Sequence, residues 1–172
     1  MATTYTLISS TTLGSTTASV TFSSIPQTYT DLLLKISPRT TNTSFGETIR
    51  IRPNNSTANG SATILRGFST GTSSYTYSNV LATNNSLGDT ATASIFASID
   101  VYIPNYTSSN YKSFSSDAVS EINNATNGRQ DIIASLWSNT AAITSLVFDN
   151  DAGSPFSFTA NSTFYLYGIK NS

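Results

Sequence analysis

The chain has 172 residues and a net charge of −1, and it contains neither histidine nor cysteine. The missing residue types exclude thiol chemistry and zinc sites of the usual Cys/His kind, and they remove the commonest general base. The eight basic residues are spread too thinly to neutralise a run of phosphates, so we expect no nucleic-acid partner. Because single cores hold on the order of 100–200 residues, we expect residues 1–172 to form one domain.

Uncharged polar residues dominate the composition. Serine, threonine and asparagine account for 30, 28 and 16 residues, whereas charged residues make up 10% of the chain. Nine tyrosines and nine phenylalanines nevertheless indicate a folded protein, since disordered segments are poor in aromatic residues. No run reaches the roughly 18 apolar residues of a membrane span, and residues 1–6 lack the basic and apolar regions of a signal peptide. We therefore expect no membrane partner and synthesis in a cytoplasm.

Short apolar and aromatic segments recur along the chain between clusters of Gly, Pro and Asn, a pattern typical of an all-β sandwich or barrel. Alternation supports several strands: residues 49–52 alternate isoleucine with arginine, and Ile95, Ala97, Ile99, Val101 and Ile103 share one parity. Pro104 then ends that strand, because proline cannot donate to the ladder. About ten strands are predicted, over residues 5–8, 18–22, 32–37, 48–52, 63–68, 94–103, 111–119, 131–137, 143–148 and 163–169.

The connections are predicted where turn-forming residues gather. The dipeptide Asn127-Gly128 indicates a hairpin connection over residues 123–128. Residues 84–88 are expected to interrupt the chain before a strand, and residues 69–78 to form a long loop or an edge segment. A short helix over residues 117–122 is an open alternative, because its apolar residues have helical spacing.

Ten strands in one domain favour a single β-sandwich of jelly-roll type, with another two-sheet sandwich as the alternative. Trp137, the only tryptophan, follows an apolar strand, so we expect it to pack in the core between the sheets.

Tyrosines near loop-like sequence are the candidate contact residues. An aromatic face beside Asn and Thr side chains suits a protein interface or the stacking of a sugar. A half-buried place in a strand is the alternative for each of them. The candidates are Tyr75, Tyr77, Tyr106 and Tyr111, with Tyr102 in the same class.

Carboxylates are the remaining candidates for catalysis. A pair of them could serve a glycosidase, and Asp117 lies close to Glu121 in the sequence, as Asp149 does to Asp151. Their neighbours are turn-forming or polar residues, so we interpret them as surface carboxylates and expect no enzyme.

Asp149 and Asp151 also resemble the start of a calcium loop. An EF-hand would place glycine at its sixth position and glutamate at its twelfth. Those positions hold Ser154 and Ala160 here, so we expect no metal site and no cofactor.

Four parts of the sequence, taken in order, carry a resemblance to a known family. They are residues 5–9 (YTLIS), residues 22–32 (FSSIPQTYTDL) followed by Arg39, residues 102–106 (YIPNY), and residues 136–144 (LWSNTAAIT) with residues 166–169 (LYGI). Together they resemble a group of small β-rich virion proteins encoded by tailed bacteriophages, frequent in marine and cyanobacterial phages. The group is described mainly as structural, and it offers no catalytic motif to carry over.

The resemblance implies a virion component made in the cytoplasm of a bacterial host. The favoured expectation is a capsid decoration (cement) protein on the capsid surface, which binds the major capsid protein as a homo-oligomer, with a trimer favoured. The alternative is a receptor-binding, carbohydrate-binding module attached to tail or fibre proteins. Decoration is favoured because the first expected strand begins at residue 5, without a fibrous shaft before it. A free-standing lectin or polysaccharide enzyme ranks below both.

Overall fold

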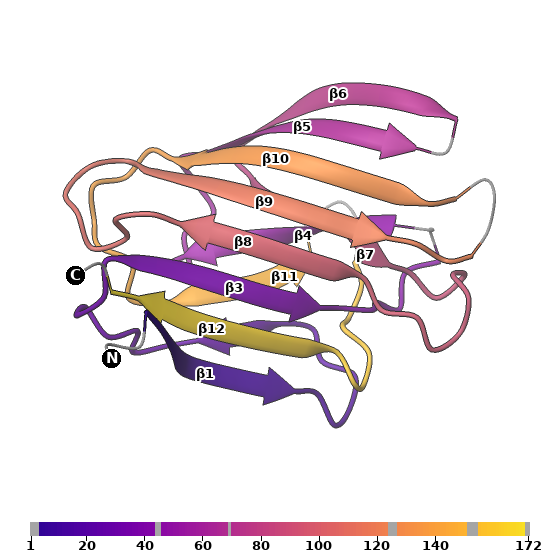
Figure 1. The fold of residues 1–172 in the computed structure, drawn as a ribbon, viewed down its shortest axis with the longest axis horizontal. Coiled ribbons are helices and arrows are strands. Elements are labelled where there is room, and N and C mark those ends of the chain that lie inside the picture. The colour runs from indigo at the N-terminus through magenta and orange to yellow at the C-terminus, as the bar shows by residue number, and fades with distance from the viewer. Residues whose placement is uncertain (1–3, 44–45, 69, 124–126, 151–154, 171–172) are drawn as a thin grey trace.

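A computed structural model describes residues 4–43, 46–68, 70–123, 127–150 and 155–170 of the chain, and they form an all-β protein without helices (Figure 1). The strands are β1 (Tyr5–Thr12), β2 (Val20–Phe22), β3 (Asp31–Ser37), β4 (Gly46–Pro53), β5 (Gly60–Phe68), β6 (Gly71–Ser78), β7 (Leu81–Leu87), β8 (Ser98–Ile103), β9 (Lys112–Ser120), β10 (Arg129–Trp137), β11 (Leu146–Asn150) and β12 (Thr163–Ile169).

The strands form two antiparallel sheets of unequal width. The larger sheet has the order β1-β12-β3-β8-β9-β10-β5-β6, and the smaller has the order β2-β11-β4-β7. In Figure 1 the larger sheet lies in front, from β1 at the bottom to β6 at the top, with the smaller sheet behind it. The expectation of an all-β, two-sheet sandwich is therefore confirmed.

The pairings of the smaller sheet and of half the larger one are nested. β1 pairs with β12, β2 with β11, β3 with β8 and β4 with β7, so the chain pairs from its ends inward. Two hairpins interrupt this order, β5–β6 between β4 and β7, and β9–β10 between β8 and β11. Both hairpins join the larger sheet, β9–β10 beside β8 and β5–β6 beside β10, which is why that sheet has eight strands and the smaller one has four.

Two strands, β6 and β7, lie outside the ranges predicted as strands, although an edge segment was one of the two alternatives for the first of them. Residues 71–78, expected as a loop or edge segment, form β6, which is an edge strand of the larger sheet. Residues 84–88 were expected as an interruption, but 84–87 belong to β7. The register between β7 and β4 shifts between Glu47 and Ile49, so the asparagines at 84 and 85 fall at an irregularity that the strand accommodates. The hairpin connection around Asn127-Gly128 is confirmed by the pairing of β9 with β10.

Two further expectations are wrong. A helix over residues 117–122 does not form, because residues up to Ser120 pair with β10 as strand β9. The strand expected from residue 94 begins only at Ser98. In the segment before that start, the buried guanidinium of Arg39 donates hydrogen bonds to four backbone carbonyls and so satisfies them without strand partners. Those carbonyls belong to Asp89, Ala91, Thr92 and Ile95.

The turns rely on asparagine. Of nine described non-glycine residues with positive φ, seven are asparagines. Asparagine tolerates the left-handed region because its short amide can hydrogen-bond the local backbone. The abundant asparagine of this chain thus serves the corners of the sandwich.

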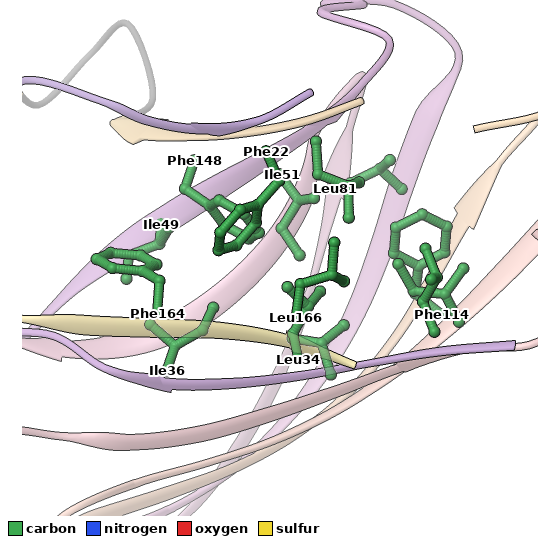
Figure 2. Close-up of a cluster of buried hydrophobic side chains, with 14 of the residues drawn as sticks. Phe22, Leu34, Ile36, Ile49, Ile51, Leu81, Phe114, Phe148, Phe164 and Leu166 are labelled. Atoms are coloured by element: carbon green, nitrogen blue, oxygen red, sulfur yellow. The ribbon is translucent and has the colours of Figure 1, made fainter. Parts of the chain in front are cut away.

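An aromatic core joins the two sheets. The Phe148 ring of the smaller sheet lies 5.7 Å from the Phe164 ring of the larger one, and Phe164 lies 5.1 Å from Phe158. Figure 2 shows Phe148 and Phe164 among aliphatic side chains that point inward from both sheets. Trp137 is 1% exposed and belongs to the same cluster, in the core position expected for it.

Candidate functional site

A groove crosses the outward face of the larger sheet over β12, β3 and β8. Along these strands the side chains alternate between the core and solvent. The register places outward side chains in two adjacent rows, each running across the three strands. The rows are Tyr165–Lys35–Asp100 and Tyr167–Leu33–Tyr102.

The groove has the size of a small-molecule site. One hollow of about 480 Å³ is lined by side chains of four strands, namely Tyr5, Leu33, Lys35, Asp100 and Tyr167. A second hollow of about 300 Å³ shares Lys35, Asp100 and Tyr167 with the first and extends past Tyr165. Ligand sites commonly span roughly 300–1,000 Å³ and combine apolar walls with a few polar groups.

Tyrosines form the apolar part of the groove. The Tyr165 and Tyr167 rings, two residues apart on β12, have centroids 6.5 Å apart and planes only 20° from parallel. Tyr5 on the adjacent edge strand is 54% exposed. Phenolic rings held this way on a sheet offer flat faces and hydroxyls together.

Charged side chains form the polar part. Lys35 Nζ lies 2.6 Å from Asp100 Oδ2, and both side chains are about half exposed, at 52% and 47%. Asp117 on β9 stands opposite Asp100 in the register, so two carboxylates are neighbours on this face. An exposed ion pair contributes roughly 0–1 kcal/mol, and like charges directly opposite are destabilising. These three charged side chains therefore contribute little to the stability of the fold.

A buried carboxylate holds one side of the groove in place. Asp31 is 4% exposed and accepts hydrogen bonds from the Tyr102 hydroxyl and from the Asn105 backbone N–H, both at 2.8 Å. The hydrogen bond to Asp31, with some burial, raises the pKa of Tyr102. Tyr102 thus stands in a fixed orientation beside Leu33.

The tyrosines singled out from the sequence do not form one site. Tyr106 is wrong as a contact residue, because it is fully buried and its hydroxyl donates to the Pro26 carbonyl. It follows the left-handed turn at Asn105, which directs it inward, and burial raises its pKa. Tyr111 is 59% exposed just before β9, as a contact residue would be.

Tyr75 and Tyr77 lie apart from the groove, on the inward side of β6. Their rings meet edge to face at 5.7 Å, and they pack against the small core cluster beneath β5 and β10. The guanidinium of Arg66 lies 5.0 Å from the Tyr75 ring centroid. These two tyrosines are half-buried strand residues, the alternative that the sequence left open.

The carboxylates considered from the sequence are dispersed. Asp149 accepts ion pairs from Arg50 at 3.0 Å and Arg52 at 2.6 Å, and Asp151 lies outside the described residues. Glu121 accepts a hydrogen bond from the Asn123 backbone N–H. Among the residues that the structure describes, no three acidic side chains gather as a metal site would require.

The sequence prediction expected contact residues beside loops, whereas the groove residues lie within strands. One signal was present in the sequence: residues 164–167 alternate Phe164 and Leu166 with Tyr165 and Tyr167. Only one face of such a strand packs in the core, so the aromatic residues on the other face remain partly exposed and indicate a contact surface. The partners Lys35 and Asp100 carried no comparable signal.

Comparison with known proteins finds no family model that matches the chain and no similar curated protein. Within the described ranges, no helix has the length and apolar character needed to cross a membrane.

Proposed function

We propose that the protein is a structural component of a bacteriophage virion, a capsid decoration protein that binds the head lattice. The resemblance of four ordered segments to phage virion proteins supports this proposal. The fold is compatible with it, since the nested pairing of β1–β4 with β7, β8, β11 and β12 is that of a chain rolled up as one long hairpin. We interpret this as a jelly roll with two inserted hairpins, a form used by viral capsid domains and also by lectins.

The edge strand β6 is the observation that carries a lattice-binding role. Within the described residues it is the last strand of the larger sheet, and its eight residues contain no charge and no proline. In Figure 1 it lies at the top with β5, beyond the smaller sheet. Edges of this length and chemistry pair readily with another strand unless charges, proline or a bulge prevent it.

The opposite edge is different. β1 has a register shift between Leu7 and Ser9, the kind of irregularity that blunts an edge. We therefore assign attachment to β6, with a strand of the major capsid protein as its partner and main-chain hydrogen bonds as the source of affinity. Association of three copies around a lattice symmetry axis remains the favoured arrangement.

Copy number tests the proposal directly. Quantitative mass spectrometry of purified virions, referred to the major capsid protein, should find hundreds of copies. A few copies per virion would overturn the decoration role and favour a tail position.

A charge at the β6 edge tests the attachment. The double variant Ser74→Lys with Thr76→Lys places two ammonium groups on exposed positions of β6 and should abolish binding to heads assembled without this protein. The matched control is Thr6→Lys with Ser9→Lys on exposed positions of β1, which should bind normally. Equal binding by both variants would contradict attachment through β6.

A receptor-binding module is the second candidate function, and the tyrosine groove is the observation that favours it. Attachment to the lattice through the β6 edge would not involve this groove, which lies over β12, β3 and β8. Low copy number together with binding of the protein to host cells would support this candidate over the first.

A further inference from the structure

We propose that the groove over β12, β3 and β8 is a binding site for a neutral oligosaccharide, with pyranose rings against Tyr165, Tyr167 and Tyr5. The inference stands on the groove itself and goes beyond the virion role, because a decoration protein and a tail protein could each present such a site. The occupant is identified by three features: the aromatic surface, the paired polar groups and the local charge.

The aromatic surface fits the apolar face of a sugar ring. A pyranose carries its axial C–H groups on its faces, and these are attracted by the negative face of an aromatic ring while apolar area is buried. Tyr165 and Tyr167 are nearly parallel on one rigid strand that is hydrogen-bonded on both sides, to β1 and β3. Little side-chain freedom is lost on binding, which favours affinity.

The polar groups fit the hydroxyls at the edge of the ring. Asp100 has two oxygens that accept hydrogen bonds, and Lys35 has three N–H donors, of which the ion pair uses one. Both side chains are about half exposed beside Tyr167 in each of the two hollows. A neighbouring pair of sugar hydroxyls, each both a donor and an acceptor, can bond to this pair without separating it.

The charges favour a neutral glycan over an acidic one. Asp117 stands next to Asp100, so this row of the face carries two carboxylates and one ammonium. A carboxylate or sulfate on the ligand would meet net negative charge, which acts against the wrong ligand. A protein partner fits less well, because interface centres are depleted in Lys and Asp, the two residues at the middle of this groove.

The experiment is isothermal titration of the purified full chain with four hexasaccharides at millimolar concentration. Three are neutral, a β-1,4-glucan, an α-1,4-glucan and a β-1,4-mannan, and one is acidic, an α-1,4-galacturonan. We expect binding of at least one neutral probe and none of the acidic one. Tyr167→Ala and Tyr165→Ala should each weaken that binding by about tenfold.

A control variant outside the groove and a second variant within it complete the experiment. Tyr111→Ala removes an equally exposed tyrosine outside the groove and should leave the affinity unchanged. Lys35→Met with Asp100→Asn alters only an exposed pair and should retain the melting temperature while binding is lost, which covers the case of a tyrosine variant that fails to fold.

Four outcomes would overturn the inference. They are no binding of any neutral probe, equal binding of the acidic probe, unchanged affinity in the groove variants, and an equal loss in Tyr111→Ala. None of them bears on copy number in the virion, so failure here is distinguishable from failure of the proposed function.

Discussion

The two halves of the sandwich have different interiors. The central half, where β3, β8 and β12 face β4 and β11, is filled by phenylalanine, leucine and isoleucine (Figure 2). The flanking half, formed by β5, β6 and parts of β7, β9 and β10, encloses a small cluster of alanine, valine and isoleucine, whereas Phe114 and Trp137 of the β9–β10 hairpin belong to the central cluster. The flanking half also buries three serine hydroxyls without hydrogen-bond partners, those of Ser116, Ser120 and Ser135.

A buried ion pair accompanies the tyrosines of the flanking half. Asp131 is fully buried and accepts two hydrogen bonds from Arg66, at 2.8 Å to Oδ1 and 2.6 Å to Oδ2. The guanidinium also faces the rings of Tyr75 and Phe68, at 5.0 and 5.7 Å. Apolar burial therefore stabilises the central half, whereas directional contacts hold the register of β5 against β10. A buried ion pair suits such a role better than it suits a gain in stability.

The largest effect is expected from loss of the shared aromatic core. Trp137→Ala and Phe164→Ala should each lower the free energy of unfolding by about 3–5 kcal/mol, because a large buried ring leaves a cavity that the sheets cannot close. Urea denaturation measures this directly. A cost below about 1 kcal/mol at either site would show that the site is not packed as described.

The buried and exposed ion pairs should differ next. Asp131→Asn leaves the Arg66 guanidinium without its carboxylate and should cost about 2–4 kcal/mol. The matched control is Asp100→Asn, which breaks the half-exposed pair with Lys35 and should cost less than about 1 kcal/mol. Similar costs for the two variants in urea denaturation would remove the distinction between the halves.

The buried serines offer a smaller effect of opposite sign. Ser135→Ala removes a buried hydroxyl that has no partner, so we expect unchanged stability or a gain of up to about 1 kcal/mol. Ser162→Ala is the control in the central half, because its hydroxyl donates to the Arg39 carbonyl and accepts from the Arg39 N–H. That variant should lose about 1 kcal/mol in thermal or urea unfolding. Destabilisation by Ser135→Ala would point to an ordered water on that hydroxyl.

The last prediction is a titration at high pH. Burial raises the pKa of Tyr75 to about 12, so the folded state retains a proton that the unfolded chain releases near its ordinary pKa of 10. Unfolding then releases a proton, and the free energy of unfolding should fall between about pH 10 and 12. Urea midpoints across this range should show a smaller fall in Tyr75→Phe. Parallel curves for the two proteins would contradict burial of the hydroxyl.

Local pattern predicted the strands better than it predicted the site. The alternation of isoleucine with arginine made β4 visible in the sequence, and the same alternation is seen in its burial. β6 was not predicted as a strand because Ser, Thr and Gly dominate it and its only alternation is that of Tyr75 and Tyr77 with Thr76 and Ser78. β7 was missed because its asparagines suggested a turn. Tyr106 was predicted as a contact residue because the turn-forming Asn105 precedes it. A turn residue indicates a loop, but it does not indicate whether the next side chain points to the core or to solvent.

The sequence by itself determined that the protein is all-β, where most strands lie, where some of its turns lie and that Trp137 is buried. These properties depend on the alternation and backbone preferences of neighbouring residues. Only the tertiary structure decided which strands pair and which tyrosines share a face. Lys35 and Asp100 are 65 residues apart in the chain, and a shift of one residue in any strand would turn its groove side chains inward. Because the packing of the whole core sets this register, it cannot be predicted from any single segment of the sequence.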